Sequence, residues 1–464
     1  MTAVLPKSRV IPSKKKENEV SSLVPVDDTQ LTSSEQLIEY VSSREKTRDR
    51  WVIGTEHEKF GWWPDRVGPP TYEDPRGIRA ILEGFASRGW VPHEENGAVV
   101  ALARGGATIT LEPGGQLELS GAPLRTLIET RDEFDQHLEE LKAVSDPLGV
   151  AWSGLGFMPW GKPFDMPRMP KPRYEILEQQ LLSAGTLGVH MMRQTATVQA
   201  NYDFSDERDA FRKFRAALYV QPIVTAMFAA SPMVNGSFVS ESSFRAAVWQ
   251  DTDPGRCTLP GVLWREGATY SDYVEWALDV PMLFIHRAGR YKDCRGTSFR
   301  EFMQHGVHGY GATVGDFAMH LSTVFPDVRM KTHLEVRAAD MGSREYVLAL
   351  PALHAGLLYD ERALEATLGL FDWMTHAQWT QLAADVPTGG LNTQIGGVQV
   401  ADLAKDVIKI ARDGLSRWEP EALSLLDPLA AAVARVECPA DRLRQVAGTP
   451  AEILKETRLV ELAV

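Results

Sequence analysis

Four short segments of the chain carry carboxylate, amide or guanidinium side chains two or a few residues apart, within alternating apolar and polar patterns. In an extended strand, residues two apart point to the same face, so the polar side chains of each segment would gather on one face. Clustered carboxylates repel one another unless cations lie between them, and hard divalent ions prefer oxygen ligands. The pattern therefore predicts a cation site, of the kind in which Mg²⁺ bridges phosphates. The polar residues are Glu56 and Glu58, Glu112 and Glu118, Gln199 and Asn201, and Glu335 and Arg337.

The alternative interpretation is a set of solvated sheet faces without a common function. For any single pair this alternative is the better one, because alternating strands often expose one polar face. Four segments of the same kind in one chain favour a site.

The spacing of turn residues predicts the elements that would hold these side chains. Short segments rich in Val, Ile, Thr and Leu are separated by turns at Asn96-Gly97, Gly105-Gly106 and Pro113–Gly115, which predicts antiparallel neighbours. Glu112 and Glu118 flank the third turn and should lie close together. Helical patterns surround this meander, and the overall prediction is an α+β fold with one antiparallel sheet.

The domain organisation expected from the sequence is simple. Residues 1–30 are polar and are expected to form a flexible N-terminal extension. Residues 31–464 are expected to form a single catalytic domain, because no linker or repeat divides them. The stretch from Ser343 to Glu452 is largely helical in pattern and would form a helical C-terminal part.

Three arginines are candidates for binding anionic groups. Arg337 follows Glu335 on the same strand face, where its guanidinium could hold a phosphoryl oxygen, although a cross-strand ion pair explains the motif about as well. Arg245 and Arg256 flank a Trp-containing turn and could bind a substrate carboxylate. Surface arginines are the simpler explanation for these two.

Other motifs give no site. The segment Gly156–Lys162 has the spacing of a phosphate-binding loop, but Pro163 replaces the Ser or Thr that would hold Mg²⁺ and no strand–loop–helix context surrounds it. The histidines form no pair four residues apart on one helix, so none is assigned to a metal. Three widely spaced cysteines fit a reducing compartment and exclude a disulfide framework.

Composition limits the class of protein. The chain has 464 residues, is 44% hydrophobic and 24% charged, and has a formal net charge of −13. The acidic balance argues against nucleic-acid binding, which needs a basic footprint. No apolar run is long enough to span a bilayer, and the N-terminus has no apolar stretch of the signal-peptide type. A cytoplasmic location is expected.

Several longer motifs resemble one family. GTEHEKFG, LEPGGQLELSGAP, GTLGVHMMRQTATVQANYDF, WQDTDPGR, DVPMLF and HLEVRAAD are similar, in the same order, to the plant and proteobacterial type of glutamate–cysteine ligase. The similarity runs from about residue 35 to at least residue 420. The LEPGGQ and MMRQT segments are specific enough that chance does not explain them.

The resemblance implies a fold and a reaction. The family fold is an antiparallel sheet curved into a bowl and covered by helices, of the glutamine synthetase/glutamate–cysteine ligase type. The reaction joins the γ-carboxylate of L-glutamate to the amino group of L-cysteine, with ATP as co-substrate and two or more Mg²⁺ ions, through a γ-glutamyl phosphate. It is the first step of glutathione biosynthesis. The expected partners are these small molecules, and the expected assembly is a monomer or a homodimer.

The resemblance also implies residue roles. Arg337 resembles the arginine that stabilises the transferring phosphoryl group, Arg245 resembles the one that holds the glutamate α-carboxylate, and Arg256 is expected to contact substrate or phosphate. Glu335 is expected to act in catalysis as well as in metal binding. The residues that resemble magnesium ligands are Glu56, Glu58, Glu112, Glu118, Gln199 and Glu335.

The cysteines depart from the plant pattern. Ala196 and Leu348 stand where plant members have the two cysteines of a regulatory disulfide, so that disulfide cannot form here. Cys294 matches a cysteine of a second plant pair, but a partner near residue 305 is missing. Redox regulation is therefore not expected.

Two other functions remain open from the residues alone. A related ATP-dependent γ-glutamyl ligase with a different amine acceptor would use the same carboxylates and Arg337. A carboxylate-rich metal-dependent amide hydrolase would need a metal-bound water but no nucleotide. A cation-binding protein without catalysis is disfavoured, because it leaves the arginines unexplained.

Overall fold

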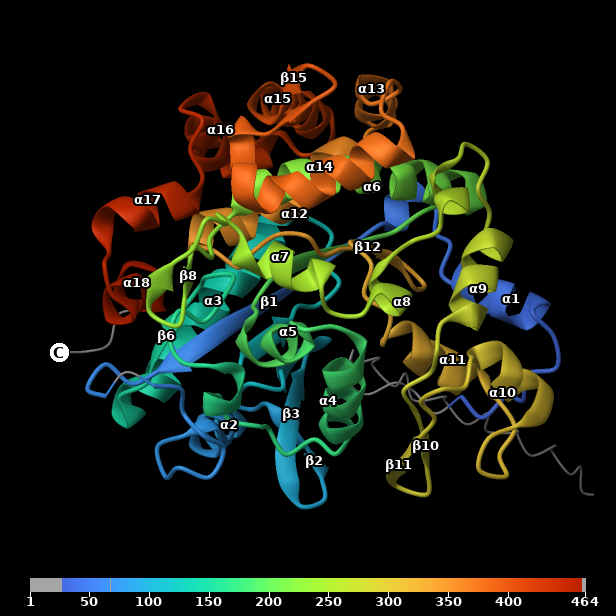
Figure 1. Cartoon of the computed structure of the whole chain (residues 1–464), viewed down its shortest axis with the longest axis horizontal. Helices are drawn as coiled ribbons and strands as arrows, with labels where there is room; N and C mark the ends of the chain where they lie inside the picture. The colour runs from blue at the N-terminus through green and yellow to red at the C-terminus, as the bar shows by residue number, and fades with distance from the viewer. Residues whose placement is uncertain (1–26, 67, 461–464) are drawn as a thin grey trace, which may run out of the picture.

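A ten-stranded antiparallel sheet forms the centre of the computed structural model, which describes residues 27–66 and 68–460 (Figure 1). Eight strands follow one another across it in the order β12-β13-β7-β1-β5-β4-β3-β2, while β6 pairs with the end of β1 and with β16. The strands are β1 (Ile53–Trp62), β2 (Val91–Glu95), β3 (Ala98–Arg104), β4 (Ala107–Leu111), β5 (Leu117–Ser120), β6 (Ala151–Ser153), β7 (Val198–Tyr202), β12 (Val328–Met330), β13 (Leu334–Val336) and β16 (Arg458–Val460).

The predicted meander corresponds to β2 through β5. Asn96 and Gly97 have φ angles of 51° and 80°, and Gly105 and Gly106 have 60° and 96°, so both two-residue turns use the left-handed region that Asn and Gly tolerate. These turns twist in the same sense as the strands they join, which gives the antiparallel pairs β2–β3 and β3–β4. The prediction of this part of the sheet is confirmed.

The third turn joins β4 to β5 and separates Glu112 from Glu118. The Gly115 N–H donates to the Glu112 carbonyl over 2.9 Å, and Glu112 N–H donates to the Gln116 carbonyl over 2.9 Å. A Cβ atom on Gly114 would lie only 2.1 Å from the backbone oxygen of Arg193, so no side chain fits there. The glycine lets the turn lie directly against the segment before β7.

Helices cover the sheet and make up most of the C-terminal part, which lies above the sheet in Figure 1. Helix α12 packs against strands β1 and β7 and against helix α15. Helix α3 packs against β1. The helices are α1 (Glu35–Ser42), α2 (Ile78–Ala86), α3 (Leu127–Ser145), α4 (Arg173–Ala184), α5 (Gly188–Gln194), α6 (Glu207–Phe228), α7 (Phe244–Gln250), α8 (Pro254–Cys257), α9 (Tyr270–Asp279), α10 (Phe299–His305), α11 (Val314–Leu321), α12 (Arg344–Leu358), α13 (Glu361–Leu370), α14 (His376–Gly389), α15 (Val400–Trp418), α16 (Asp427–Ala434), α17 (Pro439–Val446) and α18 (Pro450–Glu456).

The described residues also form three short hairpins outside the large sheet. With one large antiparallel sheet covered by helices, the α+β prediction is confirmed. None of the helices in the described ranges is long and apolar enough to cross a membrane. The hairpins are β8 (Met233–Val234) with β9 (Ser237–Phe238), β10 (Phe284–Arg287) with β11 (Arg290–Asp293), and β14 (Gln394–Ile395) with β15 (Val398–Gln399).

The two faces of the sheet differ in chemistry. On the face toward α3, His57 and Lys59 of β1 are buried, and the His57 ring lies 4.6 Å from the ring of Phe134. The Lys59 Nζ lies 2.7 Å from His57 Nδ1 and donates to the His57 carbonyl over 2.9 Å. The opposite face carries the carboxylates predicted from the sequence.

The start of the chain differs from the expectation of a flexible extension over residues 1–30. Residues 1–26 lie outside the described residues. Beyond them, Gln30 pairs with Thr313, and the Val314 N–H donates to the Thr29 carbonyl over 3.0 Å. Residues 27–30 are therefore fixed to the start of α11 by backbone hydrogen bonds.

Candidate active site

Strand register brings the predicted polar side chains onto one face of the sheet. On β1, Glu56 stands opposite Gln199 of β7, and Glu58 stands opposite Glu118 of β5. Glu335 of β13 stands opposite Asn201. Directly opposed residues in an antiparallel pair point the same way, so these side chains share one face.

A cavity of about 190 Å³ lies over this face. Most of the predicted site residues line it, and two do not: Glu335 and Arg256. The predicted residues that line the cavity are Glu56, Glu58, Glu112, Glu118, Gln199, Arg245 and Arg337. The site is thus built from the centre of the sheet, the β4–β5 turn and helix α7.

Burial and mutual repulsion raise the pKa values of the carboxylates in the cavity. Burial, then the charge of Glu335, raises the pKa of Glu56 to about 7. Burial, together with Glu112 and Glu118, holds the pKa of Glu58 well above its usual range. The pKa of Glu118 is also raised, by burial and by Glu112. A cation among these groups would relieve this repulsion.

Hydrogen bonds fix these carboxylates in direction. Asn201 Nδ2 donates to Glu56 Oε1 over 2.9 Å, and the Thr197 N–H donates to Glu58 Oε2 over 3.0 Å. The Thr110 hydroxyl donates to Glu118 Oε2. Each carboxylate keeps an oxygen available for a ligand in the cavity.

The donor chemistry of the cavity fits a hard divalent cation, although no metal-binding arrangement is preformed. Within the described ranges, no group of three or more His, Cys, Asp or Glu side chains is arranged to hold a metal ion. The donors that line the cavity are carboxylate and amide oxygens, which Mg²⁺ prefers, and Mg²⁺ commonly binds through one or two carboxylates plus substrate phosphates.

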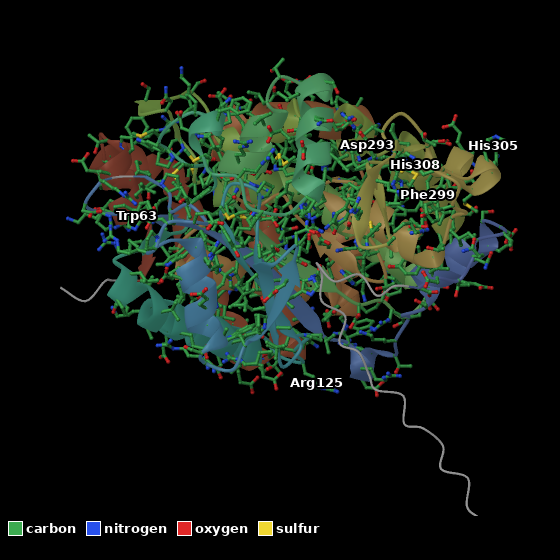
Figure 2. All side chains as sticks on the ribbon, turned by 90° about the horizontal axis from the view of Figure 1, so that it is seen from below. Trp63, Arg125, Asp293, Phe299, His305 and His308 are labelled. Carbon is green, nitrogen blue, oxygen red and sulfur yellow. The ribbon has the colours of Figure 1, made fainter. Side chains whose placement is uncertain are left out.

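Histidines contribute nothing to this site. In Figure 2, His305 and His308 lie at one end of the molecule beside Asp293, whose carbonyl is 2.7 Å from His308 Nε2. None of the histidines in the described residues lines the cavity.

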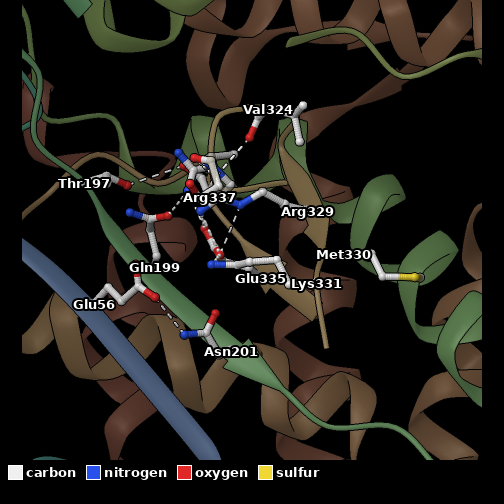
Figure 3. Close-up of polar contacts among 12 residues, drawn as sticks. Glu56, Thr197, Gln199, Asn201, Val324, Arg329, Met330, Lys331, Glu335 and Arg337 are labelled. Carbon is white, nitrogen blue, oxygen red and sulfur yellow. Dashed lines mark hydrogen bonds and ion pairs between the residues drawn. The ribbon is translucent and has the colours of Figure 1, made fainter. Parts of the chain in front are cut away.

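A basic cluster forms the neighbouring wall, and Glu335 lies at its centre (Figure 3). Arg329 Nη2 donates to Glu335 Oε1 over 2.7 Å, Lys331 Nζ donates to Oε2 over 2.8 Å, and Arg337 Nη1 pairs with Oε1. Burial alone would raise the pKa of Glu335, but Arg329, Lys331 and Arg337 hold it well below its usual range.

Glu335 lies apart from the other residues that were predicted to bind Mg²⁺. The side chain is fully buried and does not line the cavity. Its oxygens are engaged by three cationic side chains, so the structure does not present it as a metal ligand. The cations that it binds are the groups that face the cavity.

Arg245 and Arg337 both reach the cavity, but in different surroundings. Arg337 Nη1 also contacts Gln199 Oε1. Arg245 Nη2 donates to the Arg337 carbonyl over 2.9 Å and Nη1 donates to the Ala338 carbonyl over 3.2 Å. The Arg245 Nε is buried without an acceptor among the described residues.

Arg256 does not line the cavity, and its contact with substrate or phosphate stays a prediction. Its Nε donates to Asp253 Oδ2 over 2.7 Å, and its two Nη atoms donate to the carbonyls of Thr323 and Pro281. The side chain is 1% exposed. With its hydrogen bonds directed to the protein, Arg256 joins loops together.

The structure adds three cations that were missed from the sequence. Arg329, Lys331 and Arg173 line the cavity. Arg173, at the start of α4, forms no ion pair with a carboxylate among the described residues and lies 5.5 Å from the centre of the Tyr174 ring. Arg329 and Lys331 are two residues apart in β12 and its turn, which is the same signal that marked the carboxylates.

The segment Gly156–Lys162 has the structure of a connecting loop. It leads into a single 3₁₀ turn at Pro163–Asp165 instead of an α-helix. A Cβ on Gly156 would lie 2.3 Å from Asp340 Cγ, so this glycine serves close packing. The rejection of a phosphate-binding loop agrees with this geometry.

The chain is similar to known ligases over most of its length. The family model for glutamate–cysteine ligase family 2 (GCS2) matches residues 52–458. A chloroplastic glutamate–cysteine ligase of Nicotiana tabacum is 40% identical over 436 residues, which cover 92% of this chain and 83% of the relative. A chloroplastic glutamate–cysteine ligase B of Oryza sativa subsp. japonica is 41% identical, covering 90% and 84%.

A solved structure shares the fold. The crystal structure of a glutamate–cysteine ligase from Francisella tularensis in complex with AMP superposes with a TM-score of 0.54 at 12% identity, covering 88% of each chain. At this identity the likeness concerns the fold alone.

The comparisons correct one expectation and establish the family. The plant relatives are named as chloroplastic proteins, which contradicts the expected cytoplasmic location. The predicted resemblance is confirmed, because the family model covers most of the chain and the relatives match it at about 40% identity. The chain, with its carboxylate and arginine cavity over an antiparallel sheet, belongs to glutamate–cysteine ligase family 2.

Proposed function

We propose that the protein joins the γ-carboxylate of L-glutamate to the amino group of L-cysteine, using ATP and Mg²⁺, as the first step of glutathione biosynthesis. The observation that carries the proposal is a single cavity in which four carboxylates face a wall of Arg245, Arg329, Lys331 and Arg337. Phosphoryl transfer needs both parts, because metal ions and cationic side chains together neutralise the moving charge.

The names of the relatives support the nucleotide and the substrates of this proposal. The tobacco and rice relatives carry the name glutamate–cysteine ligase, and the Francisella ligase of the same fold was solved with AMP. ATP as co-substrate of this chain is the corresponding proposal. We also propose that residues 31–464 act as one catalytic unit, as a monomer or a homodimer.

The carboxylates would hold Mg²⁺ and, through it, the ATP phosphates. Glu56, Glu58, Glu112 and Glu118, with the amide oxygen of Gln199, are the oxygen donors on the cavity face. Bound Mg²⁺ would supply neutralisation of the phosphate charge and alignment of the β- and γ-phosphates. The raised pKa values of Glu56, Glu58 and Glu118 support a cation at this place.

The cations would act on the transferring group. A γ-carboxylate oxygen of glutamate attacks the γ-phosphorus, and the bond to ADP breaks. Arg337, with Lys331 and Arg329, would hold the phosphoryl oxygens during this step. Glu335 is a positioning residue in this scheme, because it orients all three cations without reaching the cavity.

The second step needs the amine close to the acyl carbon. The cysteine nitrogen attacks that carbon, loses a proton, and inorganic phosphate leaves. Arg245 would hold the glutamate α-carboxylate, and Arg173, which has no carboxylate partner among the described residues, would hold a second substrate anion. Leu177, Met191 and Phe284 also line the cavity and would exclude water from the acyl phosphate.

The test is phosphate release from ATP with Mg²⁺ and L-glutamate, with and without L-cysteine. Strong stimulation by cysteine, with γ-glutamylcysteine as product, supports the proposal. Glutamate-dependent release without cysteine stimulation points to another amine acceptor. Absence of ATP turnover, with hydrolysis of γ-glutamyl amides, would favour the metal-dependent hydrolase.

A further inference from the structure

A second cavity of about 410 Å³ adjoins the carboxylate cavity. The two share Arg245, Trp249 and Phe325 as a common wall. Residues of α6, α7 and α14 line the second cavity, and these helices pack together beside the sheet (Figure 1). A molecule that occupied both cavities would lie against these three side chains.

Three residues that line the second cavity carry hydrogen-bond donors without acceptors. Trp249 Nε1, Trp264 Nε1 and Arg245 Nε are buried and have no acceptor among the described residues. An unsatisfied buried donor is costly, so these groups are suited to a ligand that carries an anionic or carbonyl oxygen. Much of the remaining lining is apolar or aromatic, including Leu218, Pro222, Leu259 and Trp379.

Asp327 adds a carboxylate, a hydrogen-bond acceptor, to the lining of the second cavity. It is the sole carboxylate among the described residues that line this cavity, and its side chain has no hydrogen bond or ion pair with any other described residue. Its backbone carbonyl accepts from the Arg337 N–H over 3.0 Å, which fixes Asp327 beside the basic wall. Burial raises the pKa of Asp327, and the facing charges of Arg245 and Arg337 oppose that rise.

An α-amino acid matches this pair of features. Its carboxylate fits the unpaired donors at the shared wall, and its ammonium fits a carboxylate without a partner. The acyl donor and the amine acceptor of the proposed reaction are both amino acids. The acceptor must present an unprotonated amine to the acyl carbon, so an ammonium held by a carboxylate suits the acyl donor.

We propose that Asp327 accepts the α-ammonium of L-glutamate and selects the acyl donor by this contact. The α-carboxylate then lies at Arg245, and the side chain extends past the shared wall so that the γ-carboxylate enters the carboxylate cavity. This inference rests on the proposed function and adds a residue and a subsite to it.

The test compares L-glutamate with glutarate, which has the same two carboxylates and no amino group. For wild-type protein, Asp327→Asn and Asp327→Glu, the measurements are the KM for glutamate, the inhibition constant of glutarate against glutamate, and the KM for ATP. Asp385→Asn is the matched control, because Asp385 lies on α14, which borders the cavity, but is exposed and bonds Gln381.

Loss of a charge-paired contact predicts a rise of about 10- to 100-fold in the KM for glutamate in Asp327→Asn. The glutarate inhibition constant and the KM for ATP should stay within about twofold, which a general structural defect would not produce. Asp327→Glu keeps the charge and should retain most of the preference for glutamate over glutarate.

Two results would overturn the inference. One is an unchanged preference for glutamate over glutarate in Asp327→Asn. The other is an equal loss of that preference in Asp327→Glu and Asp327→Asn. Failure of the proposed function is a different result, since wild-type protein would then show no glutamate-dependent phosphate release.

Discussion

Replacement of Glu335 by Gln distinguishes a role as counter-charge to the neighbouring cations from a role as magnesium ligand. The carboxylate is fully buried and pairs with Arg329, Lys331 and Arg337. Glutamine has almost the same shape and still accepts a hydrogen bond, but it carries no charge. The substitution therefore leaves three neighbouring cations without their shared counter-charge.

The size of the effect follows from this burial. Removing one partner of a buried ion pair typically costs about 3–5 kcal/mol, because the remaining charge is uncompensated. Here solvent does not reach Glu335, and the three cations also repel one another. We expect the free energy of unfolding to fall by about 3–5 kcal/mol in Glu335→Gln, with activity reduced in parallel because Arg337 loses its orientation.

The assay is urea or thermal unfolding in Mg²⁺-free buffer, followed by phosphate release at several Mg²⁺ concentrations. Glu56→Gln is the matched substitution. Burial and neighbouring negative charge raise the pKa of Glu56 to about 7, so its ionised form is unfavourable in the fold. Neutralising it should leave the stability unchanged or increase it, by an amount on the order of 2–3 kcal/mol near neutral pH.

Equal changes in the stability of Glu335→Gln and Glu56→Gln would contradict the roles assigned to these two carboxylates. Wild-type stability of Glu335→Gln, with a raised Mg²⁺ requirement, would restore the role of Glu335 as a metal ligand. Equal destabilisation by Glu56→Gln would mean that carboxylate repulsion is not a real feature of the cavity.

Three further outcomes are expected. Glu58→Gln should lower turnover at least about 100-fold, because a carboxylate donor for Mg²⁺ is lost. The unfolding temperature should not fall, because burial and repulsion raise the pKa of Glu58 and glutamine can still accept a hydrogen bond from the Thr197 N–H. A lowered unfolding temperature would argue against this. Mild reductant should leave phosphate release unchanged, because the cysteines are free and burial raises their pKa values to about 12, 11 and 12 for Cys257, Cys294 and Cys438; a large loss of activity would contradict it. Burial lowers the pKa of His320 to about 4, so unfolding takes up a proton at this residue between pH 6.5 and 4 and stability falls with falling pH. The stability difference between wild-type protein and His320→Asn, measured by urea unfolding, should therefore narrow by about 2 kcal/mol from pH 7 to pH 5, and a constant difference would exclude this role.

Strand faces were predictable from the sequence because they depend on local periodicity. The two-residue spacing of Glu56 and Glu58 and the turn between Glu112 and Glu118 are short-range patterns, and the pleat converts them directly into a shared face. Gln199 followed from the same alternation.

Contacts made across a turn or from another element were not predictable in this way. The spacing of Glu335 and Arg337 indicates that they share a face, but it does not reveal that Arg329 and Lys331 engage the carboxylate first. Arg173 approaches the cavity from a helix that no local pattern links to the sheet. For Arg256, by contrast, Asp253 three residues earlier was a visible sign of a local ion pair.

The chemistry of the cavity depends on the register of β1 with its neighbouring strands. A shift by one residue would turn His57 and Lys59 toward the cavity and Glu56 and Glu58 toward α3, because side chains alternate along a strand. Such a slipped strand would bury two acids against Phe134 and exchange an anionic floor for a basic one. Insertions or deletions within this strand are therefore excluded, because they would bury the acids and remove the carboxylates from the cavity. Variation that preserves the enzyme is confined to substitutions within the strand and to the loops at either end.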